Sequence, residues 1–419
     1  MLGVFAVLLV LGVPVAVAMG LSAVVALFLG NVPLVLLPQT FFVAIDNFSL
    51  LAIPLFVLAG ELMNVGGITD RIVSFSQALV GHFRAGLAKA NIATNTFMSA
   101  ISGSAIADVT AVGSMMIPAM IRQGYRPEFA VAVTSCAAML GPIIPPSIMA
   151  VIYGSLMGVS IGKLFLAGIL PGLAAAAAFF VLVHVLADRG GGKPVPRSTW
   201  RQRGEAFVAA APAIALPVII VGGIMAGILT PTETGGVAVV YALMVALLRN
   251  RLNLRSFFTI VVNAAVMTGS TLVVLAGAAL FSWVLARSGA PQAMLQGLLA
   301  VSQDPTIVML LLLGGLFVLG TFLEPLPTLI LIAPVLNPLS RTMGYDPVTL
   351  GICVLMMLVL GAVSPPVGIL AMIASKIANV EYGRTFKILV PFMLVWVLMT
   401  IVTAFFPPLT TYLPSFMPN

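Results

Sequence analysis

The sequence predicts an all-α, polytopic membrane protein made of two inverted repeats, each with a re-entrant hairpin and a broken helix. Three observations carry this prediction: the composition, an internal repeat of glycines and prolines, and two diproline motifs inside apolar segments. Of the 419 residues, 61% are hydrophobic and only 7% are charged, with a mean hydropathy of +1.19. A soluble domain carries roughly a quarter charged residues. The composition therefore excludes a soluble enzyme, and it excludes a nucleic-acid-binding protein despite the net charge of +7.

The basic residues predict which side of the membrane each loop occupies. At about 20 apolar residues per crossing, the chain has room for roughly ten to fourteen spans. Lys and Arg mark the cytoplasmic side, and the longest polar stretch, 188–205, holds five of them. A second basic cluster comprises Arg249, Arg251 and Arg255. Both regions are expected in the cytoplasm, with the out-and-back pair 206–248 between them. The first 45 residues contain no Lys or Arg, so one long helix and two short ones both fit there.

Residues 90–121 are expected to form the first hairpin. Basic residues precede and follow this segment, so both of its ends are assigned to the cytoplasm. Its 32 residues are too few for two crossings, and its middle, 102–114, is small and polar. A chain that turns back near the midplane satisfies both constraints, since irregular backbone at that depth must be buried or line a cavity. A pair of short tilted helices with a polar packing face is the alternative.

The remaining elements follow from the same side assignment. A broken helix at 129–153 crosses outward and 164–186 returns, and 257–285 crosses outward again. The later elements are a second hairpin at 306–339, entered from outside, a second broken helix at 348–374 and a last span at 388–406. Arg287 and Arg341 fall on the outer side in this topology.

A shift of 220 residues superposes the two halves without gaps. The matching pairs are Pro118 and Pro338, Gly124 and Gly344, Tyr125 and Tyr345, Pro127 and Pro347, Gly141 and Gly361, Pro145 and Pro365, Pro146 and Pro366, and Pro171 and Pro391. Most of these are glycines or prolines, which dictate the backbone path. We therefore divide the chain into repeats 1–205 and 206–419. The topology places 124–127 inside and 344–347 outside, and such inverted repeats are typical of secondary transporters.

The motifs GPIIPPS (141–147) and GAVSPPVG (361–368) are expected to interrupt their helices. Each proline removes an amide donor and pushes the preceding residue out of the helical region. The freed carbonyls include those of Gly141, Ile144, Gly361 and Ser364. A dehydrated Na⁺ is a suitable partner for them, because it is a hard cation satisfied by oxygen dipoles, and the half-helix N-termini offer partial positive charge to an anion. A simple proline kink satisfied by water or hydroxyls is the alternative.

The two hairpin tips supply further candidate ligands. The first tip carries Ser102, Gly103 and Ser104, with Asp108 one turn beyond, and the second carries Gly320, Thr321, Glu324 and Thr328. A carboxylate inside a membrane is costly and usually functional. Asp108 therefore either supports a cation or caps the second arm of its hairpin. Glu61 and Glu233 rank lower: Glu61 would support the site indirectly or face a partner, and Glu233 would cap a helix start.

No motif supports enzymatic catalysis. The sequence has neither a phosphate-binding GxxxxGKS loop nor HExxH, and both histidines lie near predicted membrane ends. We therefore expect neither ATP hydrolysis nor an intramembrane serine protease. Cys136 and Cys353 lie in different apolar segments and are expected to be inert buried thiols.

Several of these segments together resemble one transporter family. Residues 11–23, 53–72, 102–125 and 141–147, with GYDPVTLG and SPPVG of the second half, resemble the large membrane subunit of tripartite ATP-independent periplasmic (TRAP) transporters. The resemblance implies an elevator-type, Na⁺-driven uptake transporter of the ion transporter superfamily, in the bacterial inner membrane. It also implies a small four-helix membrane subunit, a periplasmic solute-binding protein, and carboxylate substrates such as C4-dicarboxylates or sialic acids.

The resemblance also implies two Na⁺ sites, each between a hairpin tip and the opposing helix break. The first would comprise Ser102, Gly103, Ser104, Asp108, Gly141, Ile144, Pro145 and Ser147, and the second Gly320, Thr321, Glu324, Thr328, Gly361, Ser364, Pro365 and Gly368. We expect the carboxylate substrate against Ser104, Pro146, Ser147, Pro366 and Val367.

Two departures from the family pattern leave the second Na⁺ site less defined. The family more often has an aspartate or small residues near Glu324, and PVTLG stands where it often has PVHFG. The sequence has no N-terminal four-helix extension, so the small subunit is expected as a separate polypeptide.

Two other hypotheses stay open. One is a stand-alone organic anion carrier, coupled to Na⁺ or to H⁺ through Asp108 or Glu324, without a binding protein. The other is a channel.

Overall fold

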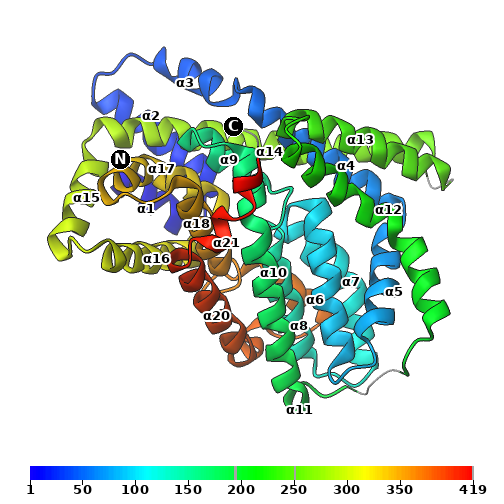
Figure 1. Ribbon diagram of the computed structural model, residues 1–419. Coiled ribbons are helices and arrows are strands. Elements are labelled where there is room, and N and C mark those ends of the chain that lie inside the picture. Colours follow the sequence, from blue (N-terminus) through cyan, green and yellow to red (C-terminus); the bar gives the residue numbers. More distant parts are fainter. Residues whose placement is uncertain (193–195, 250–251, 418–419) are drawn as a thin grey trace.

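Every regular element of the described chain is a helix (Figure 1). The computed structural model describes residues 1–192, 196–249 and 252–417. Within these ranges, eight helices are long and apolar enough to cross a membrane. The expected all-α, multi-spanning class is confirmed. Lys193 of the polar loop and Arg251 of the second basic cluster lie outside the described residues.

The first 45 residues form three short helices, α1 (Leu2–Val10), α2 (Val15–Leu29) and α3 (Leu36–Ile45). Pro14 precedes α2 and, without an amide proton, favours the break after α1. Both α2 and α3 pack along α14 (Leu254–Arg287). The crossing of α2 with α14 is close, because a Cβ on Gly277 would lie 2.9 Å from the carbonyl oxygen of Ala16. Small residues permit such approaches between membrane helices.

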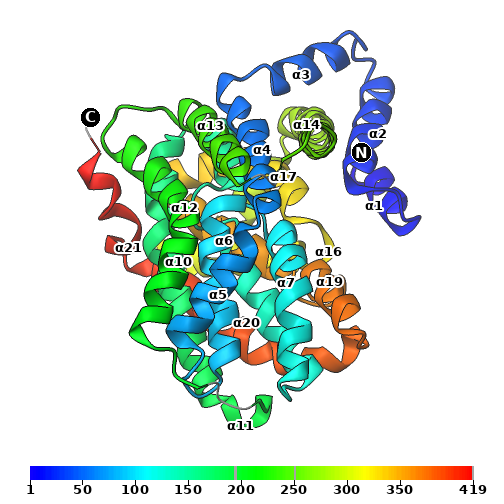
Figure 2. The ribbon, with the colours of Figure 1, turned by 90° about the vertical axis from the view of Figure 1, so that its right-hand side faces the viewer.

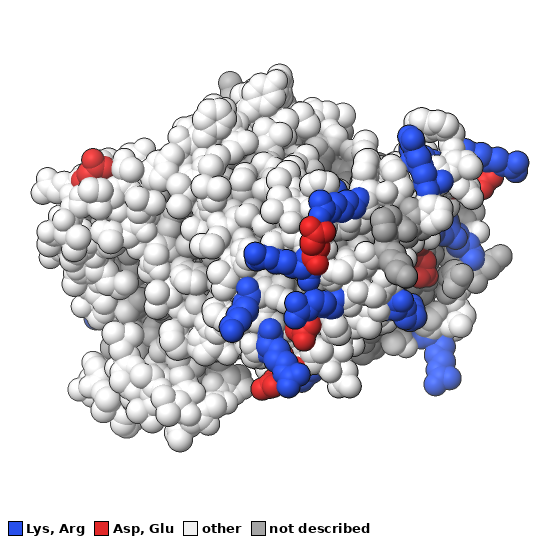
Figure 3. Space-filling model, turned by 90° about the horizontal axis from the view of Figure 1, so that it is seen from below, with Lys and Arg blue, Asp and Glu red and all other residues white. Residues whose placement is uncertain are grey.

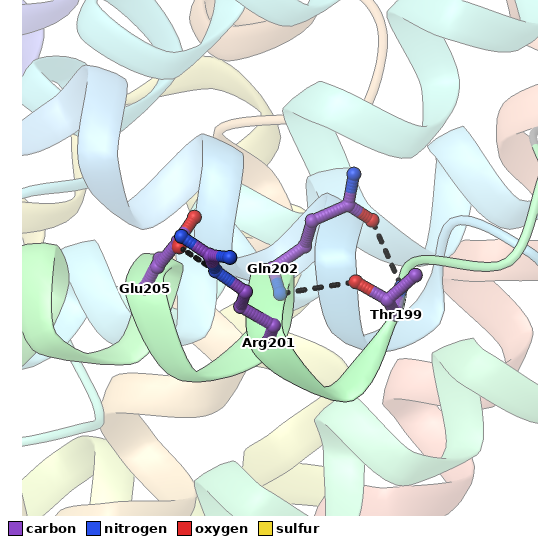
Figure 4. A network of polar contacts seen from close by, with 4 residues as sticks. All are labelled: Thr199, Arg201, Gln202 and Glu205. Carbon is purple, nitrogen blue, oxygen red and sulfur yellow. Dashed lines mark hydrogen bonds and ion pairs between the residues drawn. The ribbon is translucent and has the colours of Figure 1, made fainter.

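The next elements are η1 (Phe48–Leu51), α4 (Ala52–Val65), α5 (Ile68–Val80), α12 (Trp200–Met225) and α13 (Pro231–Leu248). Of these, α4 packs against α14, α13 packs against α4 and α12, and α12 packs against α5. The first turn of α12 is a capping box, in which Thr199 Oγ1 accepts from Gln202 N (3.2 Å) and Gln202 Oε1 accepts from Thr199 N (2.8 Å) (Figure 4). A second capping box pairs Thr230 with Glu233 at the start of α13. The expectation that Glu233 caps a helix start is therefore confirmed.

The first hairpin consists of α6 (Gly86–Ser102) and α7 (Ala105–Arg122), which pack against each other. They reverse at a two-residue turn, Gly103–Ser104. Gly103 has φ +62°, a conformation that favours glycine. Ser104 then caps α7 by accepting from Ala107 N (3.4 Å). The segment therefore forms a hairpin, and its re-entrant depth in the membrane stays a prediction.

Both diproline segments interrupt their helices. The first break, 141–147, separates α8 (Pro127–Ala137) and η2 (Ala138–Leu140) from α9 (Ile148–Met157). The second break, 362–368, separates α18 (Pro347–Gly361) from α19 (Ile369–Ala378). The bond between the two prolines is cis in each break. The two predicted interruptions are confirmed.

The remaining helices complete the two halves of the fold. They are α10 (Ile161–Val185), α11 (Ala187–Gly190), α15 (Ala290–Val301), α16 (Pro305–Phe322), α17 (Pro325–Met343), α20 (Tyr382–Phe405), α21 (Pro408–Thr411) and η3 (Pro414–Phe416). The second hairpin pairs α16 with α17 and turns at Leu323–Glu324. Figure 2 shows α1, α2 and α3 beside α14 at one upper edge, with α5, α6, α7 and α10 below.

Lys and Arg gather on one side of the face seen from below (Figure 3). The other side of this face is almost free of them in the same view. By the positive-inside rule, the basic side of this face would be the part nearer the cytoplasm. The orientation assigned from the sequence, and the inverted relation of its two repeats, stay predictions.

Candidate functional site

The first hairpin tip packs directly on the first helix break. A Cβ on Gly103 would overlap the carbonyl oxygen of Pro146. A Cβ on Gly141 would lie 2.8 Å from Asp108 Oδ2 and 3.0 Å from Ala105 N. Only glycines allow the two backbones to approach this closely. The structure therefore brings the tip, Asp108 and the first break together, as the sequence predicts.

Asp108 is fully buried and is held by two hydroxyls. Ser102 Oγ donates to Oδ1 (2.6 Å) and Ser99 Oγ donates to Oδ2 (3.2 Å). No Lys, Arg or His of the described residues forms an ion pair with it. Because Ser104 caps α7, Asp108 does not serve as the cap that the sequence left open. A buried carboxylate without a counter-ion is costly, so this position suits a bound cation.

The Ser147 hydroxyl satisfies two backbone groups of the first break. Its hydroxyl donates to Pro142 O (2.5 Å) and accepts from Ala150 N (3.1 Å), which caps α9. In the described part of the chain, no hydrogen bond reaches the carbonyl oxygens of Gly141 and Ile144. Gly141 packs against Asp108, so a buried carboxylate and a residue with a free carbonyl meet here, and both supply the oxygen ligands that a hard cation prefers. Pro145 also lies buried in this break.

The second tip also packs on the second break through glycines. A Cβ on Gly361 would overlap the backbone of Gly320, and a Cβ on Gly320 would lie 3.2 Å from Leu358 O. Thr321 and Thr328 are buried, but each hydroxyl donates to a carbonyl of its own hairpin, Val318 O and Glu324 O, both at 2.7 Å. Their oxygens keep lone pairs for a cation. The Glu324 side chain is exposed and caps nothing.

In the second break, backbone hydrogen bonds take the place of the hydroxyl that bonds in the first. Ala362 O accepts from Leu370 N (2.9 Å), and Gly361 O accepts from Ser364 N (3.1 Å). The carbonyl of Gly361 is thus satisfied, in contrast to the expectation that it would need a cation. The carbonyl of Ser364 receives no hydrogen bond within the described ranges. Gly368 has φ +55° and leads into α19, whereas Pro365 is only half-buried.

A cavity of about 470 Å³ lies where the two tips and the two breaks meet α14. Gly103, Ser104 and Glu324 line it. The other residues expected at the substrate are not part of its lining: Pro146 and Ser147 are buried, and Pro366 and Val367 are exposed. Of the expected substrate contacts, Ser104 alone faces this cavity.

Four helix N-termini converge on the cavity. The first residues of α7, α9, α17 and α19, which begin at Ala105, Ile148, Pro325 and Ile369, all line it. The N-terminus of a helix carries roughly half a positive charge and unpaired N–H groups. No Lys, Arg or His is among the lining residues. The cavity can therefore attract an anion through these backbone dipoles, opposed by the Glu324 carboxylate and by the C-terminus of α18, which lines the cavity through Val359 and Ala362.

Sequence reasoning missed two sets of residues. The cavity is closed by α14, through Met267, Ser270 and Thr271. Hydroxyls in an apolar span are the available signal, but they commonly bond their own helix, as both of these do. On α6, Asn91 and Asn95 are buried, and Asn91 Nδ2 donates to Thr134 Oγ1 (2.6 Å). Their four-residue spacing could have indicated a polar face packed inside the protein.

Comparisons with known proteins show the family and the fold of this chain. Residues 2–409 match the family described as tripartite ATP-independent periplasmic transporter, DctM component. The chain is 35% identical to the sialic acid TRAP transporter large permease protein SiaM of Vibrio cholerae, covering 97% of this chain and 96% of that one. It is 33% identical to the C4-dicarboxylate TRAP transporter large permease protein DctM of the same organism, covering 98% and 96%. Among solved structures, the Alcanivorax borkumensis YdaH transporter has a similar fold, with a TM-score of 0.56, 16% identity and coverage of 92% and 90%.

Proposed function

This chain belongs to the DctM-component family of tripartite ATP-independent periplasmic transporters, and from that premise we propose that it drives Na⁺-coupled uptake of a carboxylate-bearing solute. It is a transporter rather than an enzyme, and it is a multi-pass protein of the bacterial inner membrane. Its family takes up solutes together with a small membrane subunit and a periplasmic binding protein. We propose that both partners serve this chain, the small subunit as a separate polypeptide.

The observation that carries Na⁺ coupling is the buried Asp108 beside free carbonyls. One cation between Asp108, the Ser102–Ser104 tip and Gly141 would satisfy a carboxylate that lacks a counter-ion. The second proposed site, between the Gly320–Thr328 tip and the second break, offers threonine hydroxyls and the Ser364 carbonyl. Entry of each Na⁺ down its gradient supplies free energy, about 2.3 kcal/mol per charge for 100 mV of membrane potential.

The proposed carboxylate substrate rests on the four helix N-termini around the central cavity. Na⁺ at the two tips would add full positive charges close to the same cavity. The solute would therefore bind well only after the cations, which couples the two. We propose that the hairpins, the breaks and the bound ligands then move together across a scaffold containing α4, α13 and α14, as in an elevator.

The test is uptake by the complete transporter, reconstituted in liposomes with its small subunit and binding protein. Radiolabelled sialic acid and succinate are offered separately, with an inward gradient of Na⁺ or of choline at fixed pH. We expect uptake of one of these acids in Na⁺ and none in choline. Equal uptake in both salts would overturn Na⁺ coupling.

Glu324 is the observation that favours the alternative, a proton-coupled or stand-alone carrier. It is an exposed carboxylate in the wall of the cavity, and protonation would remove its repulsion of an anion. The same liposomes distinguish this function, since uptake would then follow a pH gradient in choline. Uptake by the purified chain without a binding protein would favour the stand-alone carrier.

A further inference from the structure

A second hollow lies beside the first hairpin, on the side that faces α4. Its volume is about 380 Å³, and its lining comes mainly from α4 and the two arms of the hairpin. We call it the α4 cleft. It shares only Ser104, Ile106 and Met267 with the central cavity. The tip of the hairpin therefore separates two spaces, and Asp108 lines the α4 cleft but not the central cavity.

Glu61 lines the α4 cleft on its α4 side. It is half-buried within a candidate membrane span, and no hydrogen bond or ion pair of the described residues involves its carboxylate. The neighbouring Gly60 brings α4 close to the hairpin, because a Cβ there would lie 3.6 Å from Ser102 Cα. An ionisable side chain is costly in a lipid-facing position and usually faces a cavity or a partner. Glu61 faces the hollow that leads to Asp108.

The opposite side of the α4 cleft is rich in oxygen acceptors. Thr110 and Ser114 of α7 are exposed, and each hydroxyl donates its proton to its own helix, at Ile106 O (2.7 Å) and Ala111 O (2.9 Å). Their oxygens can therefore present only lone pairs to the cleft. With Glu61 and Asp108, the lining holds two carboxylates and no Lys, Arg or His. A cleft lined by charge of one sign raises the local concentration of its counter-ion.

We propose that the α4 cleft is the aqueous entrance through which Na⁺ reaches Asp108, and that Glu61 attracts the cation into it. This inference rests on the proposed Na⁺ site at the first tip. Cation and solute then approach the hairpin from opposite sides. Glu61 acts as a positioning residue, because it does not touch the site between the tip and the break.

Charge-selective labelling tests the α4 cleft directly. Cys136 and Cys353 are buried and are replaced by alanine in the complete transporter, and Thr110→Cys is then introduced. Membranes in choline buffer are treated with a cationic or an anionic methanethiosulfonate of similar size. We expect faster reaction with the cationic reagent, and Glu61→Gln should reduce this preference about tenfold, as the loss of one nearby charge predicts. Glu61→Asp, which keeps the charge, should preserve it.

A matched variant reports on the central cavity. Ser270→Cys lies in the lining of that cavity but not of the α4 cleft, so Glu61→Gln should leave its labelling rates unchanged. An unreactive thiol in the Thr110→Cys variant would overturn the proposal, because the cleft would then hold lipid or be covered by a partner. An equal reagent preference with and without the Glu61→Gln change would overturn the role of the carboxylate.

A second readout separates this inference from Na⁺ coupling itself. In uptake assays, Glu61→Gln should raise the Na⁺ concentration needed for half-maximal uptake, with little change in the maximal rate. Uptake that is the same in Na⁺ and choline would contradict the proposed function, whereas the labelling preference is measured without Na⁺. An unchanged Na⁺ requirement in Glu61→Gln, with normal Na⁺-driven uptake, would contradict the inference alone.

Discussion

At the scale of single residues, glycines decide how the tips meet the breaks. Gly103 and Gly141 do so at the first site, and Gly320 and Gly361 at the second. At the second site the two glycine backbones touch each other, so a methyl group cannot be accommodated by turning a side chain. The position of the tip on the break is therefore set by main-chain contact.

Gly361→Ala is expected to abolish close contact at the second site. Overpacking costs about 1–3 kcal/mol, which corresponds to a loss of Na⁺-driven uptake of about fivefold to 150-fold if the cost falls on the bound state. Uptake is normalised to the amount of protein in the membrane. Gly315→Ala on α16 is the control, since a Cβ there meets nothing within 4 Å. Normal uptake by Gly361→Ala would contradict the proposed role of this contact.

The sequence identified some site residues and missed others for physical reasons. Asp108 stands out because a carboxylate in an apolar span demands an explanation. Ser99, which donates to Asp108, could not be chosen, because its role depends on how α6 and α7 pack. Ser270 and Thr271 lie more than 160 residues beyond the first tip, and no local sequence pattern connects them with it. Glu61 ranks low from the sequence because the cleft that it lines is formed only when α4 packs against the first hairpin.

At the scale of elements, the two breaks use different closures. Ser147 closes the first, and the corresponding residue in the second half, Val367, has no hydroxyl. There, the Leu370 amide bonds to Ala362 O instead. The prolines predicted that both helices stop, but prolines do not dictate how the ends are satisfied. The short helices α3 and α15 likewise carried no signal strong enough to be predicted.

Ser147→Ala should lower the stability of the protein by about 1–2 kcal/mol, the range for loss of an N-cap. The change leaves Ala150 N without its acceptor and Pro142 O without its donor. Thermal unfolding in detergent measures the effect. Ser160→Ala is the matched control: it removes the cap of α10, where Ser160 is exposed and accepts from Lys163 N. If both variants lose the same amount of stability, the buried Ser147 hydroxyl contributes no more than an ordinary exposed N-cap.

The start of α16 should respond to pH through Asp304. Its Oδ1 accepts from Thr306 N (2.7 Å) and Ile307 N (3.3 Å), and these backbone N–H groups hold the pKa of Asp304 below its ordinary value. A lowered carboxyl pKa gives stability that is present above the ordinary pKa and is lost as pH falls through the lowered one. Asp304→Ala should therefore lower the melting temperature at pH 7, with the difference vanishing in strong acid. A pH-independent difference would contradict this account.

At the scale of the whole molecule, the two hairpins and the two broken helices pack against an outer frame, which includes α4, α5 and α14. The hairpin helix α6 packs on α4 and α5, and α17 packs on α14. Composition, the basic flanks and short length of the first hairpin, and the glycine–proline pattern were together sufficient to predict the helical class, both hairpins and both breaks. That α14 lines the same cavity as both tips could not be predicted, because apolar faces in a bilayer do not specify which neighbour they meet. The inverted repeat and the elevator motion stay predictions.

A disulfide between α4 and the first tip should arrest transport if the hairpin moves past the frame. A Cβ on Gly60 would lie 3.6 Å from Ser102 Cα, so the two main chains are close enough for a disulfide, whose Cα atoms are usually about 4.4–6.8 Å apart. Gly60→Cys with Ser102→Cys, in a chain without Cys136 and Cys353, should lose uptake on oxidation and regain it on reduction. Each single variant is the control. Uptake by the oxidised double variant would show that this contact need not separate during transport.

The convergence of four helix N-termini has a consequence for release of the solute. Peptide dipoles hold no proton to gain or lose, so apart from Glu324 the attraction they provide is the same at the acidity of either compartment. Acidification or alkalinisation alone would then not empty the cavity into the cell. Under the proposed Na⁺ coupling, unloading would depend instead on departure of the coupling ions, and their low cytoplasmic concentration would determine how completely each cycle delivers its cargo.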